Sequence, residues 1–311
     1  MLFYFVSLHK RYNNMAHKIY IPNISRDERI GSVFNHLFRI ISDTEVNEDY
    51  DIEWDFKKTS FLHPFFIAPL SIYKQNCPKN IICINKNDTI SSYHRIISFD
   101  KTLFVDDSFS KDLSFYNGKT YTPICSFPAS NFDVSDKLEQ VVQNIIKAQT
   151  NYGRELQSPL SYILSEIVCN INQHSRAKNG YIFCQYLRKE QTLNLCIADN
   201  GDNIFGSYVR TRTLLDKVTD EAIALQYANN GYSTKGLPER GYGLKTSRDM
   251  LVNGLGGAYF MLSGSAFYRH TRDSEGAVLL PQSIVWNGTI VLLRIPIDVP
   301  TDFIFYNYLE D

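Results

Sequence analysis

Residues 158–175 read SPLSYILSEIVCNINQHS, and this segment says more about the fold than any other part of the chain. Ser158 followed by Pro159 is typical of a helix start, with Ser at the N-cap and Pro at the first helical position. Apolar residues then recur every three or four positions, which predicts a helix with one buried face. That face consists of Leu160, Ile163, Leu164, Ile167, Val168 and Ile171.

A row of polar residues runs beside this apolar face. Glu166, Asn170 and His174 follow one another at i, i+4 and i+8, so they lie on one side of the predicted helix. On its own, such a row is most often a solvated surface. A carboxylate, an amide and an imidazole at the edge of a core also suit a catalytic or binding site, so the rest of the chain decides between the two interpretations.

The neighbouring segments predict an α/β sandwich. An amphipathic helix with Ser135 as its candidate cap comes before, and a short helix over Leu244–Val252 comes after a long polar stretch. Four apolar runs read as strands. These strands are expected at Tyr181–Leu187, Leu193–Ile197, Tyr259–Leu262 and Ile290–Ile295. This order favours a mixed sheet with helices on one face.

The first half of the chain has a strand and helix rhythm of its own. Apolar residues at helical spacing over 30–41 predict a helix, and alternation over Ile52–Phe56 predicts a strand. A second helix is expected to begin near Pro64, and Ile81–Ile84 predicts another strand. We therefore expect an extension over 1–17, a small α/β domain over 18–115, a linker over 116–132 and a larger domain over 133–311.

Composition narrows the class of protein. The chain has 311 residues, of which 44% are hydrophobic and 21% charged, as expected for a folded protein of about two domains. A formal net charge of -1 gives no electrostatic case for nucleic acid or an anionic membrane. The six cysteines form no CxxC pair, and no histidine stands at zinc-ligand spacing from them, which favours thiols in a reducing compartment. We expect a cytoplasmic protein.

Three short turns stand where ligands commonly bind. DNG at residues 199–201 follows a buried strand, and a carboxylate at such a strand end can accept a hydrogen bond from an amine. RGYGL at residues 240–244 leads into a helix, whose first N–H groups and dipole favour phosphate. NGT at residues 287–289 comes before the last strand. Each turn alone is commonly just a tight connection.

Taken in order, these motifs resemble the boxes of the GHKL superfamily, which comprises gyrase, Hsp90-type chaperones, histidine kinases and MutL. Residues 165–175 resemble its N-box, 199–204 its G1 box and 240–244 its G2 box, and Gly288-Thr289 resembles the Gly-Thr pair near the end of that domain. The N-box is most similar to those of anti-sigma-factor kinases and related sensor kinases. The resemblance covers residues 133–297 and implies a Bergerat-type sandwich that binds ATP and Mg²⁺.

The resemblance also implies roles. Asn170 would coordinate Mg²⁺, and Glu166 would act as general base and reach the metal through water. Asp199 would bind the adenine amine, Gly201 would give the base room and Thr289 would support the same end. Residues 204–240 would form a lid over the nucleotide. The other residues expected around the nucleotide are His174, Asn203, Ser233, Thr234, Lys235, Arg240, Gly241, Tyr242, Gly243 and Leu244.

Within that set, four positions carry a more specific expectation. Gly241 and Gly243 would offer backbone N–H groups to the phosphates, and Lys235 would neutralise the γ-phosphate. Asn203 replaces the second glycine of the G1 box. Because Asn tolerates positive φ better than other non-glycine residues, the turn can survive this change.

The first domain resembles a STAS domain over residues 18–115, the fold of anti-sigma-factor antagonists, and would then dock or sense a partner. The phosphoacceptor serine of that family would fall near His63-Pro64, where no Ser-Ser-Gly motif is present. His63 as a phosphoacceptor is one interpretation, and a packed, hydrogen-bonded histidine is the other.

The functional hypotheses are an ATPase that switches a protein–protein interaction, an anti-sigma-type protein serine/threonine kinase, and a non-catalytic nucleotide-sensing scaffold. A histidine kinase would need an acceptor His on the helix before the ATP domain, and residues 136–149 contain none. Glu166 together with Asn170 favours catalysis over sensing alone. We expect a protein partner and, by analogy with GHKL relatives, a homodimer.

Overall fold

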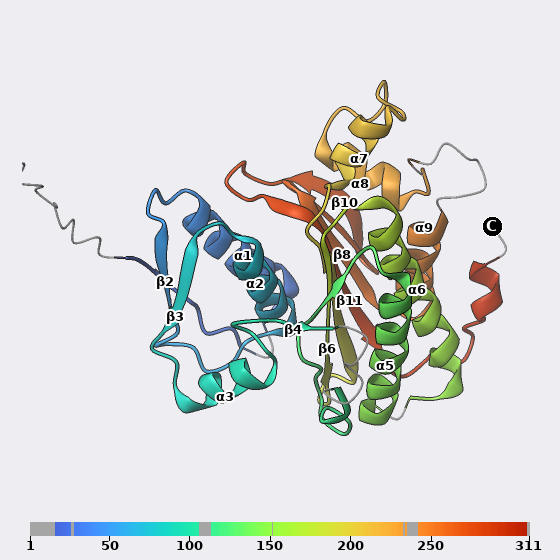
Figure 1. Ribbon diagram of the computed structural model, residues 1–311. Helices are drawn as coiled ribbons and strands as arrows, with labels where there is room; N and C mark the ends of the chain where they lie inside the picture. The colour runs from blue at the N-terminus through green and yellow to red at the C-terminus, as the bar shows by residue number, and fades with distance from the viewer. Residues whose placement is uncertain are drawn as a thin grey trace, which may run out of the picture.

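The computed structural model describes residues 16–25, 28–105, 113–150, 152–232, 234 and 242–309, and describes His174 by its backbone only. The chain is an α/β protein with a small parallel sheet near the N-terminus and a larger mixed sheet after it. Figure 1 shows the small sheet and its helices packed beside the large one. No helix of the described ranges is long and apolar enough to cross a membrane.

The N-terminal module is a three-stranded parallel sheet with the order β1-β2-β3. Its strands are β1 (His17–Tyr20), β2 (Asp51–Asp55) and β3 (Asn80–Ile84), joined through α1 (Ile30–Glu45) and α2 (Pro64–Asn76) and followed by α3 (Asp88–Ile96). Alternate strand residues, among them Ile52 and Trp54, are buried, as the period of the sequence predicts. His63 is the N-cap of α2, where its Nδ1 accepts a hydrogen bond from the N–H of Phe65 at 3.1 Å.

The second sheet has eight strands in the order β10-β9-β8-β11-β7-β6-β5-β4. All neighbours are antiparallel except β4 and β5. The last strand of the sequence, β11, therefore lies in the middle of the sheet between β7 and β8. The strands are β4 (Leu103–Phe104), β5 (Cys125–Pro128), β6 (Asn179–Leu187), β7 (Thr192–Asp199), β8 (Ala258–Gly264), β9 (Ala266–Thr271), β10 (Ser274–Leu279) and β11 (Trp286–Pro296).

One face of this sheet is covered by α5 (Phe132–Thr150), α6 (Arg154–His174) and α9 (Tyr242–Asp249), which confirms the predicted sandwich. A π-helical turn at Met250–Gly254 continues α9. Two shorter helices, α7 (Ile204–Thr211) and α8 (Glu221–Asn229), lie at one end of the sheet, and a 3-10 turn, Phe305–Tyr308, ends the described chain.

The opposite face is covered by the N-terminal module (Figure 1). Phe34 of α1 packs 4.9 Å from Phe260 and 4.8 Å from Phe267, and Phe65 of α2 packs 5.9 Å from Phe260, measured between ring centroids. The layers run from the small sheet through α1 and α2 to the large sheet and then to α5, α6 and α9. Both faces of the large sheet are thus buried.

The helix start predicted at Ser158 is wrong. The helix begins at Arg154 with Gly153 as its N-cap, and Pro159 lies inside it. Leu156, which is fully buried, extends the apolar face back by one turn. Pro159 leaves the carbonyl of Glu155 without its usual donor, but Glu155 lies in an exposed turn where water can serve.

Two further segments differ from expectation. The preceding helix starts at Phe132 rather than near Ser135, because Asn131 caps it by accepting a hydrogen bond from the N–H of Val134 at 3.2 Å. The segment 116–132, expected as a linker, contains β5, which pairs with β4 and β6. Residues 266–279, which carried no strand expectation, form the β9–β10 hairpin.

Candidate functional site

A cavity of about 570 Å³ lies between α6, α9, the α7–α8 segment and the strands β7, β8 and β11. Many of the residues expected at a site meet there although they are far apart in the sequence. The expected residues on its wall are Glu166, Asn170, Asp199, Thr234, Tyr242, Gly243, Leu244 and Thr289. Glu166 and Asn170 of the polar row on α6 therefore line a cavity, which favours the interpretation as a binding or catalytic site.

Asp199 ends β7 at the bottom of this cavity. Its side chain is 4% exposed and accepts hydrogen bonds from the N–H of Gly201, at 2.8 Å, and from the N–H of Thr289. Burial raises the pKa of Asp199 to about 7, and the two backbone donors only partly offset that rise. The carboxyl group is therefore held in place and remains able to take or release a proton near neutral pH.

The pair Gly288-Thr289 is brought directly against Asp199. A Cβ on Gly288 would lie 2.3 Å from the Asp199 carbonyl oxygen and 2.6 Å from its Oδ1, and Gly288 has a φ of +91°. Both facts require glycine at this position. The sequence alone could not show that this pair lies close to Asp199, because the contact depends on the antiparallel pairing of β11 with β7.

Ser263 on β8 is a site residue that sequence reasoning missed. Its hydroxyl lies 2.9 Å from the Thr289 hydroxyl, 2.9 Å from the carbonyl oxygen of Gly288 and 2.9 Å from the N–H of Ile204, which starts α7. Ser263 thus orients Thr289 and joins the start of α7 to β8 and β11. In the sequence, Ser263 stands beside an apolar run and before a hairpin that was not predicted. Nothing local therefore marked it as a site residue.

Gly201 and Asn203 behave differently from expectation. A Cβ on Gly201 would lie 1.9 Å from the carbonyl oxygen of Ser175, so this glycine lets the turn pack on the end of α6. It does not line the cavity. Asn203 has a φ of −69° and no positive-φ strain; it is the N-cap of α7 and accepts a hydrogen bond from the N–H of Gly206 at 2.6 Å.

Glu166 and Asn170 form the opposite wall, one helical turn apart on α6. Burial raises the pKa of Glu166 above its usual range. A Cβ on Gly243 would lie 1.8 Å from Glu166 Oε2, so the carboxylate rests against the first turn of α9. Tyr162, one turn before Glu166 on the same helix, also lines the cavity and was not expected there.

Several expected residues lie outside the described part of the chain. These are Ser233, Lys235, Arg240 and Gly241, together with the side chain of His174. Thr234 is described, and its carbonyl oxygen accepts a hydrogen bond from the Thr213 hydroxyl at 3.3 Å. The Tyr208 hydroxyl donates to the carbonyl oxygen of Tyr232, which fixes α7 to the segment after α8.

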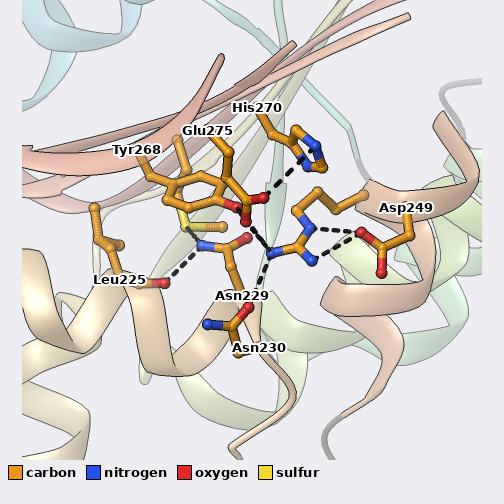
Figure 2. Close-up of polar contacts among 9 residues, drawn as sticks. Leu225, Asn229, Asn230, Asp249, Tyr268, His270 and Glu275 are labelled. Atoms are coloured by element: carbon orange, nitrogen blue, oxygen red, sulfur yellow. Dashed lines mark hydrogen bonds and ion pairs between the residues drawn. The ribbon is translucent and has the colours of Figure 1, made fainter. Parts of the chain in front are cut away.

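A polar network is centred on Arg248 of α9, the helix whose first turn borders the cavity (Figure 2). Arg248 of α9 is 5% exposed and forms ion pairs with Asp249 at 2.8 Å and with Glu275 of β10 at 3.1 Å. It also donates to the Tyr268 hydroxyl at 2.8 Å and to Asn230 Oδ1 at 3.3 Å. One side chain therefore joins α9, the end of α8 and the β9–β10 hairpin.

His63, the other histidine considered as a functional residue, is packed. It is 1% exposed, its ring lies 5.5 Å from that of Phe65, and burial lowers its pKa to about 3. These facts favour the interpretation of His63 as a helix-capping residue.

No protein-family model matches the chain, and comparisons with curated proteins and with solved structures give no match. The function must therefore be inferred from the chemistry of the cavity.

Proposed function

We propose that this chain is an Mg-ATP-binding protein of the GHKL type, an ATPase whose lid closure and hydrolysis switch a protein–protein interaction. One observation carries the proposal: Glu166 and Asn170 from α6 and Asp199 and Thr289 from the sheet line the same cavity. Its volume of about 570 Å³ falls in the range of roughly 300–1,000 Å³ that is typical of small-molecule sites.

Asp199 and Thr289 suit the adenine end. Buried Asp199 presents a carboxylate to an exocyclic amine, and two backbone donors keep it oriented. Ile197, Met261 and Val291 supply apolar wall on which a flat base can pack. An adenine would bury its faces against these side chains and direct its amine at Asp199.

The first turn of α9 and the polar row on α6 suit the phosphate end. The N–H groups of Tyr242, Gly243 and Leu244 begin a helix, so they lack intrahelical acceptors and attract anions. The Asn170 side chain carries the kind of hard oxygen that Mg²⁺ prefers, and this metal usually takes few protein ligands besides phosphate oxygens and water. The cavity thus fits Mg-ATP, with Asn170 as the residue that would hold the ion.

Glu166 suits the role of general base. A base works best when its pKa lies near the working pH, and burial moves the pKa of Glu166 in that direction. Its position against Gly243 places the carboxylate beside the turn proposed for phosphate. A water activated there would attack the γ-phosphate, while Mg²⁺ would neutralise the developing charge.

The switch is part of the same proposal. The α7–α8 segment would close on bound nucleotide, and the N-terminal module would dock or sense the protein partner, with a second copy of the chain as a further contact. The GHKL resemblance implies closure of this kind, and the tight packing of the module on the nucleotide sheet gives the module a route to respond.

The test incubates the full chain with Mg²⁺ and ATP labelled on the γ-phosphate, and counts free phosphate and protein-bound label separately. Glu166→Gln should abolish free-phosphate release but retain nucleotide binding, while Glu155→Gln, an exposed change on the same helix, should behave like wild type. Label retained on protein would replace the ATPase with the kinase hypothesis. Binding without either product would leave the sensing scaffold.

A further inference from the structure

A second cluster of chemically active side chains lies in the N-terminal module, on the other side of the large sheet from the cavity. Cys83 of β3, His94 of α3 and Asp100 just after α3 each direct one ligand atom at the others, and these atoms all lie within 4.8 Å of one another. This cluster could not be predicted from the sequence, because its residues do not follow zinc-ligand spacing and meet only when α3 packs beside β3.

His94 is the observation that points to a ligand. It is 1% exposed, and neither Nδ1 nor Nε2 has a hydrogen-bond partner among the described residues. Buried polar groups are nearly always satisfied, so an orphaned imidazole indicates a ligand, an ion or a water at that position. Its ring is held between Phe99, at 4.0 Å and nearly parallel, and Phe56, at 4.8 Å and perpendicular.

The neutral imidazole suits a metal, whereas the protonated thiol opposes one until its proton is displaced. Burial lowers the pKa of His94 to about 4, so the ring is neutral at physiological pH, which is the form that binds metals. Burial raises the pKa of Cys83 to about 12, so a bound cation must displace the thiol proton, which leaves to solvent or buffer.

Asp100 is the third member of the cluster, and its ion pairs with lysine compete with a cation. Its carboxylate is half-exposed and forms ion pairs with Lys86 at 2.9 Å and with Lys74 at 3.7 Å. A cation must displace at least one ammonium group from Asp100. The side chains of Lys86 and Lys74 are 21% and 15% exposed, so displacing either one lowers the affinity for the cation.

We propose that Cys83, His94 and Asp100 bind Zn²⁺, with water as the fourth ligand. A thiolate, an imidazole and a carboxylate together suit zinc better than the hard ions Mg²⁺ and Ca²⁺. The ion replaces the thiol proton of Cys83, satisfies His94 and takes over one bond that Asp100 makes to lysine. It joins α3 to β3 and stiffens the end of the module, and this role does not depend on nucleotide in the other cavity.

The experiment uses the full chain, stripped of metal by a chelator and free of nucleotide. Cobalt(II) is added as a coloured substitute for zinc, the charge-transfer absorption of a cobalt–thiolate bond is followed, and zinc is then added to displace it. We expect one cobalt ion per chain. Cys83→Ser should remove the band, and Cys77→Ser and Cys169→Ser, two half-buried cysteines outside the cluster, should retain it.

The lysine variant separates metal binding from structural damage. Lys86→Met removes the competing ammonium group, so it should tighten cobalt and zinc binding, whereas a general loss of structure would weaken both. Asp100→Asn should weaken binding by at least about tenfold. If His94→Gln fails to fold, Cys83→Ser and Lys86→Met still test the proposed site, because both residues are only half-buried. A wild-type chain without a cobalt–thiolate band, or a band that survives Cys83→Ser, overturns the proposal.

Discussion

Asp199 and Gly243 both line the cavity, and the surroundings of each predict the effect of a point mutation. Asp199 is a buried carboxyl group whose pKa is raised to about 7, so its charged form costs the folded state free energy. At Gly243, the Glu166 carboxylate occupies the space that a side chain would need.

Asp199 predicts a pH dependence of stability. Its folded pKa lies above its unfolded value of 3.8, so its favourable contribution is complete below about pH 4 and is lost as pH rises through about 7. The total change is on the order of 4 kcal/mol at most. Asp199→Asn, which keeps an acceptor oxygen for the same backbone donors, should lack this part of the profile. Urea unfolding of both proteins at pH 5 and pH 8 measures the difference, and equal changes in both would contradict this account.

The glycines predict two opposite outcomes. Gly201→Ala forces a Cβ within 1.9 Å of the Ser175 carbonyl oxygen, a backbone atom, so the free energy of unfolding should fall by about 1–3 kcal/mol. Gly243→Ala meets only the end of the flexible Glu166 side chain, so stability should change little while phosphate release falls. Gly31→Ala, in an open helix position, serves as control. Equal destabilisation by both changes would show that the Glu166 side chain cannot move aside for a methyl group at position 243, and would contradict this prediction.

Much of the candidate site was predictable at the residue scale. Glu166, Asn170, Asp199 and Thr289 could be selected because helical spacing and strand-end turns are local patterns, and all four line the cavity. Ser263 could not, because its importance comes from the pairing of β8 with β11. Gly201 was selected for a role at the ligand, whereas the structure uses it for packing against α6.

At the element scale, the Arg248 network holds α8, α9 and the β9–β10 hairpin together, as Figure 2 shows. The two ends of α9 therefore have different contacts. Its first turn borders the cavity, and its last turn is held to the hairpin by Arg248. A helix fixed at its C-terminal end can keep its N-terminal N–H groups in position.

Arg248→Met should loosen these elements more than it unfolds the chain. Its partners Asp249 and Glu275 are partly exposed and can be rehydrated, so we expect a loss of about 1–3 kcal/mol. Amide exchange should rise in α8 and β10, with little change in α5. Glu275→Gln, which keeps an acceptor for Arg248, is the matched control. Uniform exchange throughout the chain would contradict a local role.

Elements with a long, regular apolar pattern were predicted best. The alternation of β2 and the helical spacing of α1 and α6 each appear in the structure. Residues that commonly mark helix ends were less reliable, since Ser158-Pro159 is typical of a helix start but lies inside α6. The β9–β10 hairpin was not predicted because its outer strand alternates weakly and because a stabilising partner, Arg248, lies outside the hairpin.

At the scale of the whole molecule, the N-terminal module and the large sheet share one hydrophobic core. A polar link accompanies it. Asn76 at the end of α2 accepts hydrogen bonds from Asn200 at 3.0 Å and from the Tyr181 hydroxyl at 3.1 Å. Asn200 directly follows Asp199, so the module contacts the turn that shapes one end of the cavity.

This contact predicts that the module influences ligand binding. Asn76→Ala should shift the affinity for ATP by several-fold, because Asn200 loses its partner beside Asp199, while the fold is retained. Asn80→Ala, which removes an exposed hydrogen bond to Asp51 in the same module, should leave affinity unchanged. Calorimetric titration of both variants measures this, and equal affinities in wild type and Asn76→Ala would remove the link. Nothing local in the sequence indicated this coupling, because Asn76 and Asn200 meet only through the docking of the two parts.

The central claim is that the cavity recognises Mg-ATP through Asp199. The most direct measurement is a binding titration of the full chain with ATP and with GTP, each with Mg²⁺, repeated on Asp199→Asn. Guanine carries a carbonyl where adenine carries its amine, so a carboxylate acceptor should disfavour it strongly. We predict that wild type binds ATP and discriminates against GTP by at least about a hundredfold, and that Asp199→Asn loses at least about tenfold in ATP affinity. Equal binding of the two nucleotides, or no binding of ATP, would contradict the account.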